Sequence, residues 1–252
     1  MAVVVFGGNG FVGTNVLKAL CARQIPAVSI SRSGGRPQHL ASEPWAAGVA
    51  WETGDAAVAA TYYERLVGAR AIVVSVGSPP VPFVDYEWQK RVNGASNAAP
   101  ISAARDAGVA RVVIINAMMP AWAPAGYVDG KRMAEAAAAE FAAAAALDGD
   151  GADGGTGSRG AVVLKPGAVY GTRYTKGGTP IPLAPVLAPV SWALTAMPGV
   201  VSGLTSALPS VLEGALVPPV NVERLAEAAA EGATSDKYTG KVTVLDSFAL
   251  NS

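Results

Sequence analysis

The stretch Val3-Val4-Val5-Phe6-Gly7-Gly8-Asn9-Gly10-Phe11-Val12-Gly13 joins an apolar run to three glycines spaced G-x-x-G-x-x-G. The run predicts a buried strand, and a helical pattern follows it, with apolar residues on one face at Val12, Val16, Leu17 and Leu20. Gly7 and Gly10 permit backbone angles and close approaches that a Cβ excludes, and Gly13 lets the helix pack tightly on the strand. The helix start presents unpaired N–H groups and a positive dipole end. We therefore predict that residues 7–13 bind the pyrophosphate of a dinucleotide.

Composition limits the kinds of protein that this chain represents. Its 252 residues suffice for one large α/β domain, with 51% hydrophobic and only 15% charged residues. Basic and acidic residues balance at 19 each, without a basic block of the kind that binds nucleic acid. Cys21 and His39 are the only residues of their types, so we expect neither an intramolecular disulfide nor a metal site. Cys21 is expected in the core and His39 in an exposed loop.

Apolar runs of strand type alternate with helical patterns along the rest of the chain. They occur at residues 27–31, 49–51, 71–77, 111–117, 161–164 and 241–245. This alternation predicts a doubly wound parallel sheet of the α/β class, in a single domain over residues 1–252. Ligands of such sheets bind beyond the carboxyl ends of the strands. We therefore assign Ser75, Val76 and Gly77, which end the fourth run of this kind, to the nucleotide site.

The loop after the second strand indicates which dinucleotide is bound. Ser31-Arg32-Ser33 stands where an NAD-binding chain carries an acid for the ribose 2′-hydroxyl, and Arg36 follows. Guanidinium groups bind phosphate through paired hydrogen bonds, so this loop predicts NADP, with NADPH preferred over NADH. The alternative is that these arginines are solvated loop charges. After the third strand, Gly54-Asp55 is predicted to bind the adenine amino group, or else Asp55 caps the next helix.

Tyr127 and Lys131 form the candidate catalytic pair. Their spacing of four residues at the start of a predicted helix places both side chains on one face. A phenol has an ordinary pKa of about 10, and a nearby lysine cation favours the phenolate and lowers that pKa. The ammonium group can also donate hydrogen bonds to ribose hydroxyls. The pair therefore predicts acid–base chemistry beside a nicotinamide.

A long apolar segment interrupts the pattern near the end of the chain. Residues 177–212 contain no Asp, Glu, Lys or Arg in 36 positions, and their prolines disfavour one continuous spanning helix. We expect short apolar helices that form a cap of roughly residues 172–216. Such a cap can line an apolar substrate pocket, contact a bilayer interface, dock on a partner protein, or simply pack on the core.

These motifs together resemble the short-chain dehydrogenase/reductase superfamily, in its extended and atypical branches. The resemblance extends to a central helix with Gly94-x-x-Asn97 and to the nicotinamide-side loop Pro166-Gly167-x-Val169-Tyr170-Gly171. It implies a Rossmann fold and adds Asn97, Pro166, Gly167 and Val169 to the cofactor site. Tyr127-x-x-x-Lys131 resembles the active pair of the superfamily. One departure is that no serine follows Ile115, where the family has its catalytic serine; Asn116 is expected to polarise the substrate carbonyl instead.

The glycine loop, the Val28–Gly34 stretch and the segment Gly126–Glu135 resemble more narrowly an atypical organelle branch of the superfamily. That branch includes a mitochondrial NAD(P)-binding protein associated with coenzyme Q biosynthesis, and plastid relatives. The resemblance implies an organellar location, on the matrix side of the mitochondrial inner membrane or in a plastid. It also implies a quinone or isoprenoid connection, peripheral membrane contact, and a membrane complex as partner through residues 177–212.

Two functional hypotheses follow from these observations. The first is an NADP-dependent oxidoreductase that acts on a hydrophobic carbonyl or quinone-like substrate through Tyr127, Lys131 and Asn116. The second is a catalytically weak NADP-binding accessory or assembly subunit of an organellar membrane complex. The retained tyrosine–lysine pair favours the first hypothesis, and the missing serine favours the second.

Overall fold

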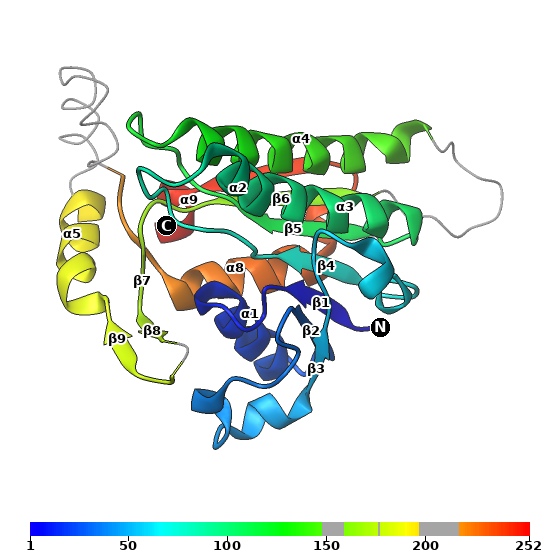
Figure 1. The fold of residues 1–252 in the computed structure, drawn as a ribbon, viewed down its shortest axis with the longest axis horizontal. Coiled ribbons are helices and arrows are strands. Elements are labelled where there is room, and N and C mark those ends of the chain that lie inside the picture. The colour runs from blue at the N-terminus through cyan, green and yellow to red at the C-terminus, as the bar shows by residue number, and fades with distance from the viewer. Residues whose placement is uncertain (148–158, 176, 197–216) are drawn as a thin grey trace.

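A computed structural model describes residues 1–147, 159–175, 177–196 and 217–252. Its centre is a seven-stranded sheet in the order β11-β6-β5-β4-β1-β2-β3, with every neighbouring pair parallel (Figure 1). The strands are β1 Val3–Phe6, β2 Ala27–Ser31, β3 Val49–Thr53, β4 Ala71–Val74, β5 Arg111–Ile115, β6 Gly160–Lys165 and β11 Val242–Asp246. The predicted doubly wound parallel sheet is therefore confirmed.

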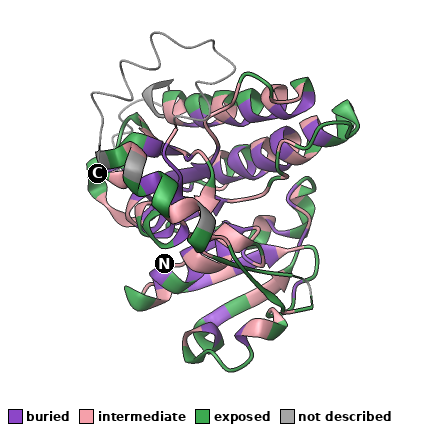
Figure 2. Ribbon diagram, turned by 90° about the vertical axis from the view of Figure 1, so that its left-hand side faces the viewer, coloured by how far each residue is buried: buried purple, intermediate pink, exposed green. Residues whose placement is uncertain are grey.

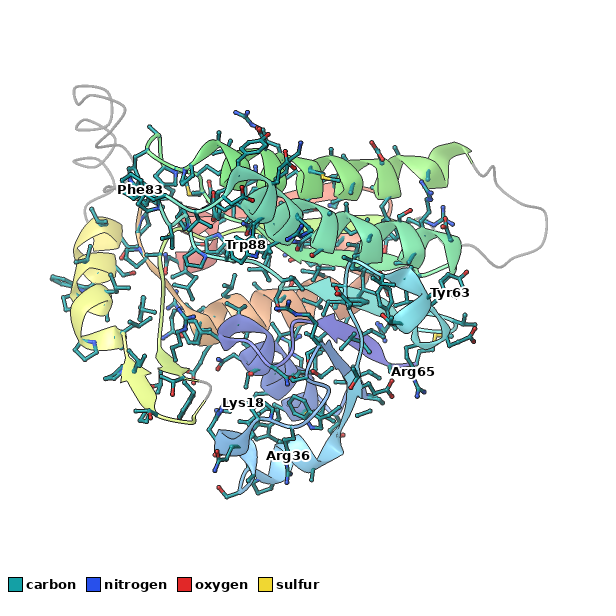
Figure 3. All side chains as sticks on the ribbon, viewed as in Figure 1. Lys18, Arg36, Tyr63, Arg65, Phe83 and Trp88 are labelled. Carbon is teal, nitrogen blue, oxygen red and sulfur yellow. The ribbon has the colours of Figure 1, made fainter. Side chains whose placement is uncertain are left out.

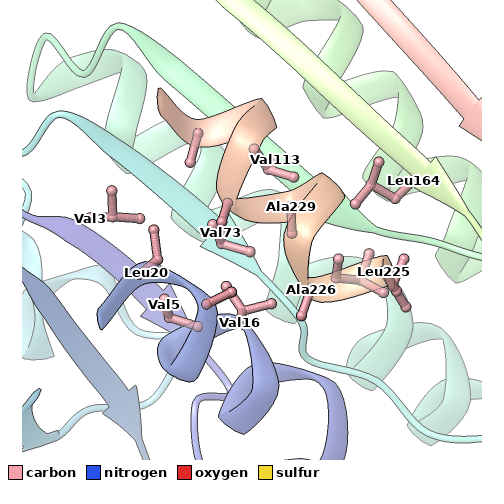
Figure 4. Packing of buried hydrophobic residues seen from close by; sticks show 14 of the residues in the cluster. Val3, Val5, Val16, Leu20, Val73, Val113, Leu164, Leu225, Ala226 and Ala229 are labelled. Carbon is pink, nitrogen blue, oxygen red and sulfur yellow. The ribbon is translucent and has the colours of Figure 1, made fainter. Parts of the chain in front are cut away.

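Helices cover both faces of this sheet, because side chains along each strand alternate between the two faces. Val3 and Val5 of β1 pack with α1 (Phe11–Ala22) and α8 (Val222–Thr234), as Figure 4 shows. Val4 and Phe6 face the opposite layer. That layer is built from α2 (Tyr86–Lys90), α3 (Ser96–Asp106) and α4 (Ala125–Leu147). Burial is accordingly concentrated in the sheet and on the helix faces that meet it (Figure 2).

Shorter elements complete the described chain. A π-helical turn, Arg91–Ala95, connects α2 to α3 without a break. The 3₁₀ turns span Gln38–Leu40, Pro44–Gly48, Ala59–Thr61, Tyr63–Arg65 and Asp236–Tyr238, and α9 spans Ser247–Asn251. The carboxyl ends of the strands meet the loops that leave β1, β4 and β5, so the predicted site residues gather along that edge of the sheet.

The region around the predicted cap contains small elements outside the main sheet. β7 (Val169–Tyr170) pairs in parallel with β10 (Val220–Asn221), and β8 (Thr172–Tyr174) pairs antiparallel with β9 (Pro180–Pro182). α5 (Ala184–Ala196) follows and contains an internal proline. Residues 197–216 of the expected cap lie outside the described residues, so the cap and its 172–216 boundaries stay a prediction. Among the described helices, none combines the length and apolar character needed to cross a membrane.

Candidate functional site

The strand order reverses at β1, and we call the region beyond the carboxyl ends of β1, β4 and β5 the crevice. The chain leaves β1 toward β2 on one side and returns to β4 on the other, so the loops after β1 and β4 diverge at this point. Open α/β sheets bind their ligands at such a reversal of strand order. Both predicted nucleotide-binding stretches, residues 7–13 and 75–77, lie here. Ser75 Oγ donates to the carbonyl of Phe6 at 3.0 Å and thereby ties the two loops together.

The glycine loop has the geometry that a pyrophosphate requires. Gly7 has a φ of +80°, which L side chains rarely adopt. A Cβ on Gly13 would lie 2.2 Å from the carbonyl oxygen of Gly7, so only glycine lets α1 approach the turn this closely. Gly10 is the N-cap residue with a φ of −86°, so its angle does not require glycine. The first turn of α1 carries no acid and no side-chain cap, which leaves its N–H groups and dipole for an anion.

Asn9 connects the glycine loop to the loop after β2. Its Nδ2 donates to Ser33 Oγ at 2.9 Å and to the carbonyl of Gly35 at 2.8 Å, while its Oδ1 accepts from Ser29 Oγ at 3.2 Å. The two loops therefore form one continuous rim. Gly8 lies under this rim, where a Cβ would come 2.3 Å from Ser29 Oγ.

Two guanidinium groups project from the loop after β2. Arg32 and Arg36 are exposed, and neither has a hydrogen-bond or ion-pair partner among the described residues; Figure 3 labels Arg36 on this loop. Ser31 Oγ accepts from the N–H of Gly34, which turns the chain back toward the glycine loop. The loop carries no acid between residues 31 and 36. Its residues fit a 2′-phosphate, although the preference for NADP over NAD remains a proposal.

Asp55 lies at the end of β3 beside Gly54. Its Oδ1 accepts a hydrogen bond from the N–H of Ala57 at 3.0 Å. This bond closes a local turn. The next helical turn, Ala59–Thr61, has Val58 as its N-cap, so the capping alternative is wrong, and the adenine contact stays a prediction.

Tyr127 and Lys131 lie one turn apart on α4, as their spacing predicts. Both are buried, at 5% and 6% exposure, and Lys131 Nζ is 5.8 Å from the centre of the Tyr127 ring. Lys131 Nζ donates to the carbonyl of Ile115 at 3.3 Å, its only hydrogen bond among the described residues. A Cβ on Gly77 would lie 3.6 Å from the same nitrogen. Lys131 Nζ therefore lies between the end of β5 and the loop after β4.

Burial controls the acidity of both side chains. Desolvation raises the pKa of Tyr127 to about 12. Desolvation also lowers the pKa of Lys131 to about 8, against the opposing charge of Glu135. The direction of the Tyr127 shift is therefore opposite to the expectation that Lys131 lowers its pKa. The physical reason is that burial disfavours the charged phenolate.

The amide of Asn116 has a different role from the one predicted. Its Nδ2 donates to the carbonyl of Lys131 at 3.2 Å and to Glu135 Oε1 at 2.5 Å, so both N–H groups are used. Its Oδ1 is buried and has no hydrogen-bond partner among the described residues. Glu135 also forms an ion pair with Lys165 at 2.8 Å. Asn116 is therefore part of a buried network with Lys131 and Glu135, and both of its N–H groups are already bonded there.

The remaining predicted cofactor residues lie in two supporting places. Asn97 is buried and donates to the carbonyl of Val76 at 3.0 Å, so it holds the end of β4 from behind. Pro166 and Gly167 follow β6, where the Gly167 N–H donates to Ser247 Oγ at 2.5 Å. Val169 belongs to β7. Asn97 thus positions the crevice wall, and direct contact of these residues with a nucleotide stays a prediction.

Sequence reasoning missed Asn93, Ser78 and Glu135. Asn93 is fully buried and holds Ser78 through two hydrogen bonds. Spacing carries no signal for Asn93 or Ser78, because their partners lie 15 residues apart. Glu135 stands four residues after Lys131 on the same helix face, which is the one signal that was present.

A cavity of about 380 Å³ opens beside the glycine loop, and Asn9, Gly10 and Phe11 of that loop form part of its lining. It is lined by residues of α1, β8 and the start of α8, among them Phe11, Lys18 and Glu223. His39 and Tyr174 stack at its rim, with ring centres 4.1 Å apart, so His39 is half-buried rather than exposed as expected. Neither Tyr127 nor Lys131 lines this cavity, which is therefore distinct from the catalytic pair.

Comparison with known proteins agrees with this geometry. Residues 7–158 match the family described as NAD(P)H-binding. The uncharacterized chloroplastic protein At1g32220 of Arabidopsis thaliana is 36% identical over 246 residues, which cover 96% of this chain and 74% of that protein. MIOREX complex component 2 of Saccharomyces cerevisiae is 35% identical over 77 residues, 30% of this chain and 28% of that protein.

Solved structures show the same fold at low identity. An oxidoreductase of the short-chain dehydrogenase/reductase family from Burkholderia thailandensis gives a TM-score of 0.63 at 16% identity, covering 100% of this chain and 93% of that one. The dTDP-glucose 4,6-dehydratase DesIV of Streptomyces venezuelae, with NAD bound, gives 0.63 at 17% identity, covering 98% and 76%. The chain therefore belongs to the NAD(P)H-binding family and has the Rossmann fold of the short-chain dehydrogenase/reductase proteins.

Proposed function

We propose that this protein is an NADP-dependent oxidoreductase, with NADPH preferred, that reduces a hydrophobic carbonyl or quinone-like substrate. The observation that carries this proposal is the placement of Tyr127 and Lys131 together at the crevice, with Lys131 Nζ beside Gly77. The nucleotide fits because Gly7 and Gly13 leave the space for a pyrophosphate and α1 offers its free N–H groups.

The bound dinucleotide supplies the hydride for such a reduction. Lys131 has N–H groups beyond the one that meets Ile115, and these are placed to bind ribose hydroxyls. The Tyr127 phenol stays protonated across the neutral pH range, because burial raises its pKa to about 12. It therefore acts as a proton donor to the substrate oxygen rather than as a base. This assignment favours the reductive direction.

Exposed apolar side chains near the crevice support a hydrophobic substrate. The loop after β4 carries Phe83, which is fully exposed with a φ of +64°, and Trp88 on α2 is 40% exposed (Figure 3). Trp122 lies in the loop after β5 and is 57% exposed. Exposed apolar side chains that gather on one surface can mark a contact with a ligand or a partner. Both loops follow strands that end at the site, so their apolar groups lie on the side where the substrate enters.

An organellar location is part of the proposal. It rests on two relatives, one a chloroplastic protein of a plant and the other a component of a yeast complex. The earlier expectations of peripheral membrane contact and of a membrane complex bound through residues 177–212 remain proposals. Trp192 of α5, which is 73% exposed, supports an apolar contact surface there.

The test measures NADPH oxidation with a panel of quinones and hydrophobic aldehydes or ketones. The readout is the loss of nucleotide absorbance. Tyr127→Phe is expected to lower kcat by about 10²-fold or more with an unchanged Kd for NADPH, because it removes only the proton donor. Turnover that survives in the Phe variant would show that another group donates the proton.

A second candidate is an NADP-binding accessory subunit. Two observations favour it: both N–H groups of the Asn116 amide are already bonded within the protein, and no serine follows Ile115. In that case the nucleotide stabilises the fold by mass action without turnover. Thermal stabilisation by NADPH together with no activity on any acceptor would support this candidate over the reductase.

A further inference from the structure

The loop after β4 is held by two asparagines of the opposite helix. Asn93 Oδ1 accepts from the N–H of Ser78 at 3.0 Å, and Asn93 Nδ2 donates to Ser78 Oγ at 3.0 Å. Asn97, one turn later, donates to the carbonyl of Val76 at 3.0 Å. Both asparagines are buried, so these bonds are shielded from water. The conformation of residues 76–78 is therefore fixed from behind.

The π-helical turn Arg91–Ala95 makes this arrangement possible. It contains Asn93, whose Nδ2 also donates to the carbonyl of Gln89 at 3.0 Å. Gly94 packs on Gly130 of α4, where a Cβ would lie 3.0 Å from the Gly130 Cα. This close contact brings the turn and its loop against the helix that carries Lys131. Single π-helical turns inside α-helices recur at functional sites.

The position of Ser78 follows from its neighbours along the loop. Ser75 lies beside Gly7, at the pyrophosphate end of the crevice. Gly77 lies beside Lys131 Nζ, at the end assigned to the nicotinamide ribose. The loop thus runs from the pyrophosphate toward the nicotinamide, and Ser78 is the next residue in that direction. The adenine end, marked by Arg32 and Asp55, lies on the opposite side of β1.

The chemistry of Ser78 is that of an unused donor. Its oxygen accepts a hydrogen bond from Asn93, while its own O–H meets no acceptor among the described residues. The side chain is half-buried rather than enclosed. A hydroxyl that already accepts a hydrogen bond is a stronger donor, because the two bonds polarise one another. A bound nicotinamide nucleotide would offer two kinds of acceptor to this hydroxyl, the ribose oxygens and the carboxamide oxygen.

We propose that Ser78 donates a hydrogen bond to the nicotinamide half of the bound dinucleotide, with Asn93 as its positioning residue. This inference rests on nucleotide binding as set out in the proposed function, and it does not require turnover. Both N–H groups of Asn116 are already bonded, and no serine follows β5. Ser78 offers a hydroxyl donor from a different loop, the one after β4.

The experiment compares two ligands by calorimetry: NADPH, and adenosine 2′,5′-bisphosphate, which lacks the nicotinamide half. Ser78→Ala is expected to raise the Kd for NADPH by about 2- to 12-fold, the range of one hydrogen bond. The Kd for the bisphosphate should stay unchanged. Ser78→Thr keeps the hydroxyl and is expected to retain NADPH affinity. Ser102→Ala, an exposed serine on α3, is the matched control.

Asn93→Asp tests the positioning role with Ser78 still present. The new carboxylate accepts from the serine O–H and withdraws it from the ligand, so the same selective loss for NADPH is expected. A thermal midpoint measured in parallel shows that the variant is folded.

Two outcomes would overturn the inference. One is an unchanged Kd for both ligands in Ser78→Ala, and the other is an equal loss for both, which would make Ser78 a support of the whole loop. Wild-type protein that binds NADPH without turning over any acceptor would defeat the oxidoreductase proposal and leave this inference standing. Wild-type protein that does not bind NADPH would overturn both.

Discussion

Gly13→Ala is the sharpest perturbation of the nucleotide loop. The added methyl group would lie 2.2 Å from the Gly7 carbonyl oxygen and 2.8 Å from Ser75 Oγ. The Gly7 oxygen cannot move away easily, because Gly7 has a φ of +80° and its N–H is bonded to the Ile30 carbonyl at 2.9 Å. The start of α1 must therefore shift outward from β1 by about 1 Å to restore an ordinary contact.

The magnitude follows from the cost of overpacking. Inserting a methyl group into a tightly packed site costs roughly 1–3 kcal/mol. For a domain of this size each kcal/mol lowers the unfolding midpoint by about 2–4 °C, so a loss of about 2–12 °C is expected. The shift also moves the N–H groups of residues 10–13 away from the pyrophosphate. NADPH affinity should therefore fall in addition to stability.

The assay is thermal unfolding with and without NADPH, with Gly48→Ala as the matched control. A Cβ on Gly48 meets nothing within 4 Å, and its φ is not positive, so that variant should unfold at the wild-type midpoint or slightly above it. If Gly13→Ala unfolds at the wild-type midpoint and NADPH raises it by the same amount, the close approach is not what selects glycine, and the reasoning is refuted.

Three further predictions concern charges. Arg32→Ala combined with Arg36→Ala should weaken NADPH at least about tenfold and leave NADH unchanged in calorimetry, because only NADPH carries the 2′-phosphate; equal losses would contradict this. The Lys131 pKa is about 8 in the folded protein against 10.5 ordinarily. The unfolded chain therefore binds more protons between these values, and the free energy of unfolding should rise across that pH window in urea titrations. Lys131→Met should remove the rise. Glu135→Gln should lower the free energy of unfolding by about 1 kcal/mol, because it removes the half-buried ion pair with Lys165. A double-mutant cycle with Lys165→Met that shows no coupling energy would disprove that pair.

The features that sequence predicts well here are local or periodic. The parallel sheet and its two apolar faces follow from runs of valine and isoleucine that alternate with helical patterns. The close approach of Gly13 and the shared face of Tyr127 and Lys131 depend on neighbours within one turn or one loop. The structure therefore agrees with both.

The features that sequence predicts poorly depend on distant partners. The role of Asn116 is decided by Glu135, 19 residues away on another element. The pKa of Tyr127 is decided by burial, which the Tyr-x-x-x-Lys spacing does not report. The pairing of β10 with β7 in a separate small sheet depends on β11, which already pairs with β6 at the edge of the main sheet. In each case the deciding contact is tertiary.

The measurement that tests the central claim most directly is a crystal structure of the protein with NADPH. The account predicts pyrophosphate oxygens on the N–H groups at the start of α1, and a ribose hydroxyl about 3 Å from Lys131 Nζ. The Tyr127 hydroxyl should lie beside the nicotinamide ring. A nucleotide bound away from the start of α1, or a crevice in which Lys131 touches no ribose, would contradict the account.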